Sequence, residues 1–300
     1  LALTFDTVGP LARSTYDIAA ALNVLVGIDP DDDSTLKSAG RVPADYTAYL
    51  KTGSLKGARI GIARDFFGKD AGIDAVLEQA IAKLRELGAI IVEDVRIPAP
   101  VQAARGPLYN TIRSAEFKSQ IADYLATIAA KYPKNIFDLA RLANDPATGY
   151  RSPGKAVGLK YQAETSLLLS DPVYIAAKTD GLSYVRSAME GLFANHQLHA
   201  LLYPTSPTPV SLINPPPREG GPATPNTGAN PLNIANLTGY PDLVIPAGMA
   251  PNGLPVTFSL MGRAFTEGRL LGYAYDYEQA TKALRLPVNT PALPSDLLVP

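Results

Sequence analysis

The chain has 300 residues, of which 46% are hydrophobic and 18% are charged, and its formal net charge is −1. This length suits one large domain or two ordinary ones, and the composition is typical of a globular protein. The near-neutral balance argues against nucleic acid as a partner, because phosphate binding needs a surplus of Lys and Arg. The sequence has no Cys, which excludes disulfides, a thiolate nucleophile and a Cys-ligated metal.

The sequence contains two histidines, His196 and His199, near the end of an expected helix. No neighbouring Glu or Asp completes a metal site around them, and two histidines leave little room for a Ser-His-Asp triad. We interpret both as structural, with an imidazolium favoured near the negative end of a helix. The expected protein therefore uses no metal and no cofactor.

No apolar run is long enough to span a membrane, and no signal peptide is visible. The sequence opens Leu-Ala-Leu-Thr without a Met, which is typical of a truncated or cleaved N-terminus. We expect a cytoplasmic location, with any targeting segment upstream of Leu1. The sequence does not indicate which oligomeric state the protein adopts.

The first predicted helix spans residues 14–27. Ser14 and Asp17 form a capping pair at its start, and Gly27 is a natural stop. Its inward positions are Ile18, Ala21, Leu22 and Leu25. The Asp-rich run at 29–33 lacks the Gly and the distal Glu of an EF-hand, so we interpret it as a solvated loop.

The clearest local unit follows. Residues 58–63 form a predicted buried strand, residues 73–87 an amphipathic helix that stops at Gly88, and residues 89–95 a second strand. A strand, a helix and a strand in this order predict a βαβ unit, and therefore a sheet that is at least partly parallel.

The rest of the chain mixes helices and strands. Residues 107 to 196 are mainly helical, and Asp171 before Pro172 predicts a helix start there. Three more strands are predicted at 200–203, 241–246 and 255–261, followed by a terminal helix at 266–284. Residues 204–231 contain nine prolines and three glycines, which predicts a long functional loop. The predicted class is α/β.

Several short motifs occur in a family-like order. Residues 5–14 are Phe-Asp-Thr-Val-Gly-Pro-Leu-Ala-Arg-Ser, and Tyr-Pro-Thr-Ser-Pro follows at 203–207. Asn-Leu-Thr-Gly-Tyr-Pro, Pro-Ala-Gly and Gly-Leu-Pro-Val begin at positions 236, 246 and 253. Their shared order and spacing closely resemble the amidase signature family of serine hydrolases. Residues 99–195 carry only general helical character, and in that family this region varies and shapes substrate preference.

The resemblance implies that residues 1–300 are the C-terminal part of a single amidase-signature domain. Its mixed, partly parallel sheet would be covered by helices on both faces and would be incomplete in this chain. Family members cleave amides with a Ser nucleophile, a second Ser on a cis peptide bond and a Lys base. The motifs that hold these residues precede the Asp-Thr-x-Gly-Pro run and are not found here, so no catalytic residue is assigned.

The resemblance therefore implies an amidohydrolase that acts on a linear carboxamide. The alternative is a non-catalytic relative or subunit that uses the same fold for binding or assembly. The expected partners are a small amide substrate and the missing N-terminal segment of the same protein. Without that segment we expect an uncovered apolar surface bordered by residues 1–13 and the helix at 14–27.

Five residues are candidates for substrate binding. Asp6 and Thr7 would directly follow the missing catalytic region, and the alternative for Asp6 is a loop cap before Gly9. Thr205, Ser206 and Asn236 would lie at strand ends that border the Pro-rich loop, where α/β proteins tend to bind ligands. The alternative for Asn236 is a helix or turn cap before Gly239. The family's glutamine-handling subunits have an acidic residue seven positions before this Asn, whereas this chain has Ala229 there.

Overall fold

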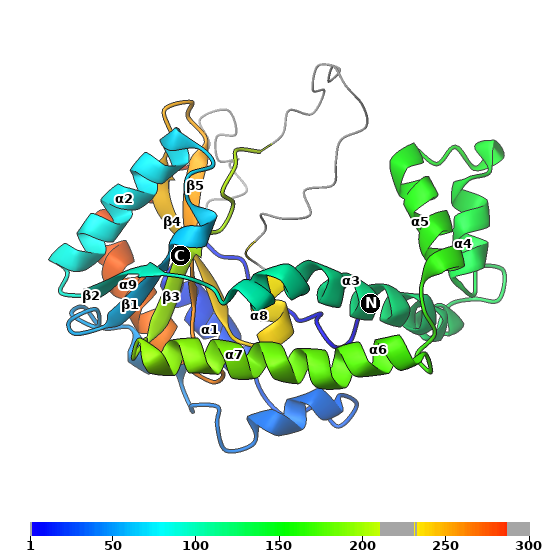
Figure 1. Cartoon of the computed structure of the whole chain (residues 1–300), viewed down its shortest axis with the longest axis horizontal. Coiled ribbons are helices and arrows are strands. Elements are labelled where there is room, and N and C mark those ends of the chain that lie inside the picture. The colour runs from blue at the N-terminus through cyan, green and yellow to red at the C-terminus, as the bar shows by residue number, and fades with distance from the viewer. Residues whose placement is uncertain (1, 211–230, 232, 287–300) are drawn as a thin grey trace, which may run out of the picture. The chain divides into compact units, whose positions relative to one another are not determined.

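The computed structural model describes residues 2–210, 231 and 233–286, and these divide into two compact units (Figure 1). The first, which we call the helical unit, takes residues 2–9, 97–194 and 233–239. The second, the sheet unit, takes residues 10–96, 195–210, 231 and 240–286. The expectation that the whole chain belongs to a single domain stays a prediction.

The sheet unit contains a five-stranded sheet in the order β2-β1-β3-β5-β4. In chain order the strands are β1 (Arg59–Ala63), β2 (Ile90–Val95), β3 (Ala200–Pro204), β4 (Asp242–Met249) and β5 (Pro255–Met261). β1 is parallel to β2 and β3, whereas β5 is antiparallel to β3 and β4. The predicted α/β class with a mixed, partly parallel sheet is confirmed, and the predicted βαβ unit is β1, α2 (Ala71–Glu86) and β2.

One face of this sheet packs against α2 and α9 (Glu267–Thr281). Because side chains alternate along a strand, Ile60 and Ile62 of β1 and Leu202 of β3 point to this face. The buried positions of α2 recur at helical spacing, as the sequence predicts: Ile73, Val76, Leu77, Ala80, Ile81 and Leu84. Each large apolar side chain buried here stabilises the fold by about 1.5–3 kcal/mol. All of these residues belong to one hydrophobic core.

Helix α1 (Thr15–Leu25) packs on α9. Ser14 is its N-cap as predicted, and the backbone N–H and hydroxyl of Thr15 both donate to Glu278 at 2.7 Å. Two details of the predicted helices are wrong. In α1, Leu25 is 50% exposed rather than inward. Helix α9 ends at Thr281 rather than at the predicted residue 284, and Lys282 directly after it adopts a left-handed conformation with φ of 48°.

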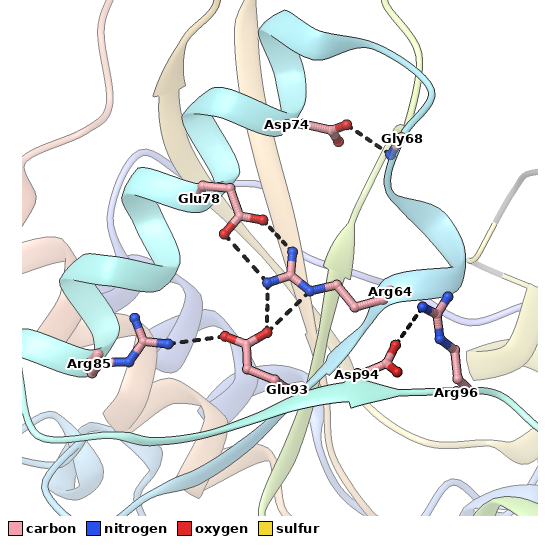
Figure 2. A network of polar contacts seen from close by, with 8 residues as sticks. All are labelled: Arg64, Gly68, Asp74, Glu78, Arg85, Glu93, Asp94 and Arg96. Atoms are coloured by element: carbon pink, nitrogen blue, oxygen red, sulfur yellow. Dashed lines mark hydrogen bonds and ion pairs between the residues drawn. The ribbon is translucent and has the colours of Figure 1, made fainter.

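An ion-pair network links the strands and helix of the βαβ unit (Figure 2). Arg64, which begins a short 3-10 helix (Arg64–Phe66) after β1, pairs with Glu78 of α2 and with Glu93 of β2. Arg85 of α2 also pairs with Glu93, at 3.0 Å. Two further 3-10 helices, Asp33–Ser38 and Tyr46–Tyr49, lie between α1 and β1.

The helical unit is built around α3 (Ala99–Ala126). It also contains α4 (Ile136–Ala143), α5 (Pro153–Thr165), α6 (Pro172–Ala176), a π-helical turn (Ala177–Gly181), α7 (Leu182–Asn195) and α8 (Asn233–Thr238). A short 3-10 helix, Pro146–Thr148, separates α4 from α5. Asp171 caps α6 as predicted, and α3 begins before the predicted position, with Pro107 inside it. Within the described residues, no helix is long and apolar enough to cross a membrane.

Candidate functional site

Asp6 and Thr7 follow a tight turn at the N-terminal end of the helical unit. The backbone N–H groups of Phe5 and Asp6 both donate to the carbonyl of Ala2, at 2.8 and 2.9 Å. The Asp6 carboxylate in turn accepts from the N–H of Ala2 at 3.1 Å. Asp6 therefore caps this turn. Ala2 and Phe5 are buried while Asp6 and Thr7 are exposed, so the turn presents both polar side chains to solvent.

Asn236 lies next to this turn. It is an interior residue of α8, so the predicted strand-end location and the alternative cap role are both wrong. Its side-chain amide donates to the carbonyl of Phe5 at 3.4 Å, and the Phe5 ring stacks on Tyr109 of α3 at 4.9 Å between centroids. The structure thus brings together three of the five predicted site residues, Asp6, Thr7 and Asn236.

Thr205 and Ser206 lie in the sheet unit, directly after β3 as predicted. The Thr205 hydroxyl is 3.2 Å from the hydroxyl of Ser259 on β5, and its N–H donates to Thr257 at 3.3 Å. The Ser206 hydroxyl donates to the carbonyl of Thr208 at 2.7 Å. The Thr205 contacts hold the start of the Pro-rich loop against β5, whereas the Ser206 contact lies within the loop. Residues 211–230 of that loop are outside the described residues.

Ser206 also lines a small cavity of about 100 Å³ in the sheet unit. Its apolar wall includes Ile73, Val210 and Leu254, and its polar groups include Asp70, the N-cap of α2. A second cavity, of about 340 Å³, lies between the segment 40–49 and the start of α9. No predicted site residue lines this second cavity, where burial raises the pKa of Glu267.

Sequence reasoning missed a buried polar cluster in contact with Thr205. It consists of the buried residues Tyr203 on β3 and Ser259 on β5 and the half-buried Asp242 on β4. Burial raises the pKa of Asp242 and, together with the Asp242 charge, raises that of Tyr203. The available signal was an Asp at the start of an otherwise apolar strand.

The two histidines have structural contacts. His199 accepts the backbone N–H of Arg59 at its Nδ1 atom, at 3.2 Å, and the His196 carbonyl accepts from the Arg59 guanidinium. Burial lowers the pKa of His199, followed by the charges of Arg269 and Arg59. An Nδ1 atom that accepts a hydrogen bond carries no proton, so the contact with Arg59 favours the neutral form of His199. Among the described residues, no group of three His, Cys, Asp or Glu side chains could hold a metal ion.

Residues 1–271 match the family model described as Amidase. A glutamyl-tRNA(Gln) amidotransferase subunit from Thermoanaerobacter pseudethanolicus is 34% identical over 289 residues, which cover 94% of this chain and 56% of that protein. Among solved structures, native peptide amidase from Stenotrophomonas maltophilia is 32% identical with a TM-score of 0.78, covering 94% of this chain and 55% of the other.

A third comparison supports the fold alone. A glutamyl-tRNA(Gln) amidotransferase subunit from Thermotoga maritima is 21% identical with a TM-score of 0.54, covering 92% of this chain and 53% of that one. In all three comparisons this chain spans only about half the length of the protein that it matches.

Proposed function

This chain belongs to the Amidase family, and from that membership we propose that it forms the C-terminal part of an amidohydrolase acting on a linear carboxamide. The family match over residues 1–271 carries the proposal. The Ser nucleophile, the second Ser and the Lys base would lie N-terminal to this chain. A neutral Lys that acts through a hydroxyl can replace a histidine as the general base. This mechanism needs no histidine from this chain, whose His199 already accepts a backbone hydrogen bond at Nδ1.

The proposed contribution of this chain is substrate binding. An exposed carboxylate at Asp6 would accept an N–H of the substrate, and the hydroxyl of Thr7 would donate to its carbonyl. Asn236 donates to the carbonyl of Phe5, the residue directly before Asp6, which supports a common role for the three. Thr205 and Ser206 stay separate candidates within the sheet unit, where Ser206 lines a cavity.

Among linear carboxamides we favour a peptide amide. Two solved structures called peptide amidase are 34% and 32% identical to this chain, with TM-scores of 0.80 and 0.78. The alternative is a subunit that serves binding or assembly, and it is favoured by the curated relatives, whose name describes one subunit of an amidotransferase. Ala229, which stands where glutamine-handling subunits have an acidic residue, is outside the described residues. A cytoplasmic location stays a prediction.

The test uses the complete protein with its preceding segment. Ammonia release is measured with a peptide amide, free glutamine, an aliphatic amide and an aromatic amide. The proposal expects turnover of the peptide amide and little turnover of glutamine. Turnover of glutamine alone would contradict the preference for a peptide amide. No turnover of any amide would contradict the proposal and support the alternative of a subunit that serves binding or assembly.

Two variants test the role of this chain. Replacing both Asp6→Asn and Thr7→Ala is expected to lower kcat/KM for the best amide about 10- to 100-fold. Asp33→Asn, which removes an exposed carboxylate elsewhere, is the control and should leave kcat/KM unchanged. Shortening the loop at 204–231 is expected to change the order of preference among the four amides. Equal kinetics for the double variant and the control would contradict substrate binding by Asp6 and Thr7.

A further inference from the structure

The most completely buried carboxylate of the helical unit's α3 belongs to Glu116, which is 0% exposed. Four donors converge on it. Its Oε1 atom accepts from the hydroxyl of Thr4, from the Tyr174 hydroxyl at 2.9 Å and from the Lys178 ammonium at 2.9 Å. Its Oε2 atom accepts the backbone N–H of Thr4 at 3.0 Å. Two of the four bonds therefore come from one residue of the turn that carries Asp6.

The same face of α3 makes further contacts with this turn. Gln120, one helical turn beyond Glu116, accepts the N–H of Leu3 at 2.9 Å. Tyr109, two turns before it, stacks on Phe5. Residues 109, 116 and 120 are spaced so that they share one side of the helix. Successive residues 3, 4 and 5 of the turn are thus each fixed to α3.

The remaining two donors come from α6 and the π-helical turn that follows it. Tyr174 and Lys178 are four residues apart, and their side chains contact each other at 3.2 Å as well as Glu116. The end of this turn approaches α3 so closely that a Cβ atom at Gly181 would lie 2.5 Å from Leu108. A π-helical turn adds a residue to the helix and often marks a functional site.

The charge of Glu116 is stabilised by these contacts. Burial opposes ionisation, but the hydrogen bonds from Thr4, Lys178 and Tyr174 hold the pKa of Glu116 below its ordinary value. If the group served only to pack the core, an apolar side chain of similar volume would do as well or better. The two carboxylate oxygens accept both the N–H and the hydroxyl of Thr4, which an apolar side chain could not do.

We propose that Glu116 is a positioning residue that holds the turn at residues 2–6 and thereby sets the location of Asp6 and Thr7. The proposal rests on the proposed function where it concerns substrate binding, but the anchoring of the turn stands apart from it. Glu116 touches no substrate. It acts through Thr4, with Tyr174 and Lys178 holding the carboxylate in place.

Hydrogen exchange of the complete protein tests the anchoring without any assay of activity. In Glu116→Gln, one amide nitrogen replaces an acceptor oxygen, so the amides of Leu3 and Thr4 are expected to exchange at least about tenfold faster. Asp123→Asn, on the exposed side of α3, is the control and should change neither amide. If Glu116→Gln fails to fold, Tyr174→Phe removes one of the four bonds to Glu116, together with the contact to Lys178, and should show a smaller increase. Unchanged exchange in the folded variants would overturn the anchoring.

A kinetic cycle tests whether Glu116 acts through Asp6 and Thr7. Glu116→Gln alone is expected to raise KM about tenfold with a smaller change in kcat, because the residues it positions bind substrate. Added to the variant that carries Asp6→Asn and Thr7→Ala, the same change should have little further effect. Additive losses would overturn the positioning role. If the wild-type protein is inactive but Glu116→Gln still speeds hydrogen exchange at Leu3 and Thr4, the result would count against the proposed function and support the anchoring.

Discussion

The hydroxyl of Tyr203 donates a hydrogen bond to Oδ2 of Asp242, while Oδ1 of the same carboxylate is buried without a partner among the described residues. Tyr203 is on β3 and Asp242 is on β4, the two strands that flank β5. The bond therefore links two strands that do not pair with each other. Because Oδ1 of this carboxylate accepts no hydrogen bond from any described residue, the bond from Tyr203 to Oδ2 is important for stability.

Loss of this bond should be measurable as a change in folding stability. Tyr203→Phe in the complete protein is expected to lower the free energy of unfolding by about 2 kcal/mol, because the carboxylate would lose a buried donor. The measurement is urea denaturation at neutral pH. Tyr16→Phe, at a position that is 58% exposed, is the matched control. Similar values for the two variants would show that the Tyr203 hydroxyl contributes little.

The two histidines give a prediction for pH. The folded-state pKa of His199 is lowered from its ordinary value of 6.5 by burial and by two neighbouring arginines. The unfolded chain therefore binds the proton more readily, so stability from neutral His199 is present above about pH 6.5 and is lost as the pH falls below it. His199→Gln should flatten this dependence and His196→Gln should not. Parallel pH curves for wild type and both variants would contradict this account.

The network in Figure 2 should contribute modestly and in a salt-dependent way. The Arg64 side chain is 21% exposed, and its partners Glu78 and Glu93 are 51% and 47% exposed. Arg64→Met is expected to lower the free energy of unfolding by about 1 kcal/mol at low salt, and by less at about 1 M salt. Lys83→Met, which removes the single ion pair with Glu86, should lower the free energy of unfolding by only a few tenths of the loss expected for Arg64→Met. A loss independent of salt would indicate a packing effect.

Exposed apolar side chains in the sheet unit bear on the predicted need for a companion segment. Leu11 is 100% exposed, and Val24 and Ile28 are 85% and 55% exposed. We expect the 300-residue chain expressed alone to bind a hydrophobic dye strongly, and the complete protein to bind it weakly. The dye fluorescence of the two preparations, at equal molar concentration, is the measurement. Weak binding by the chain alone would contradict the predicted segment.

The sequence was most informative where structure is local. The βαβ unit and the helix caps at Ser14 and Asp171 are encoded by short-range periodicity and by neighbouring residues. The role of Asn236 was not accessible in this way, because α8 has only six residues and is too short to show a helical period. The contact between Thr4 and Glu116 spans 112 positions, and no local pattern indicates such a pair. The ends of helices were also imprecise, as at Lys282.

The proposed function places the Ser nucleophile in a segment that would precede this chain. Its most direct test is labelling of the complete protein with a fluorophosphonate, followed by peptide mapping of the modified residue. The account predicts one labelled serine N-terminal to this chain, and no labelling of the 300 residues alone. Stoichiometric labelling of a serine within residues 1–300, or no labelling of the complete protein, would contradict it.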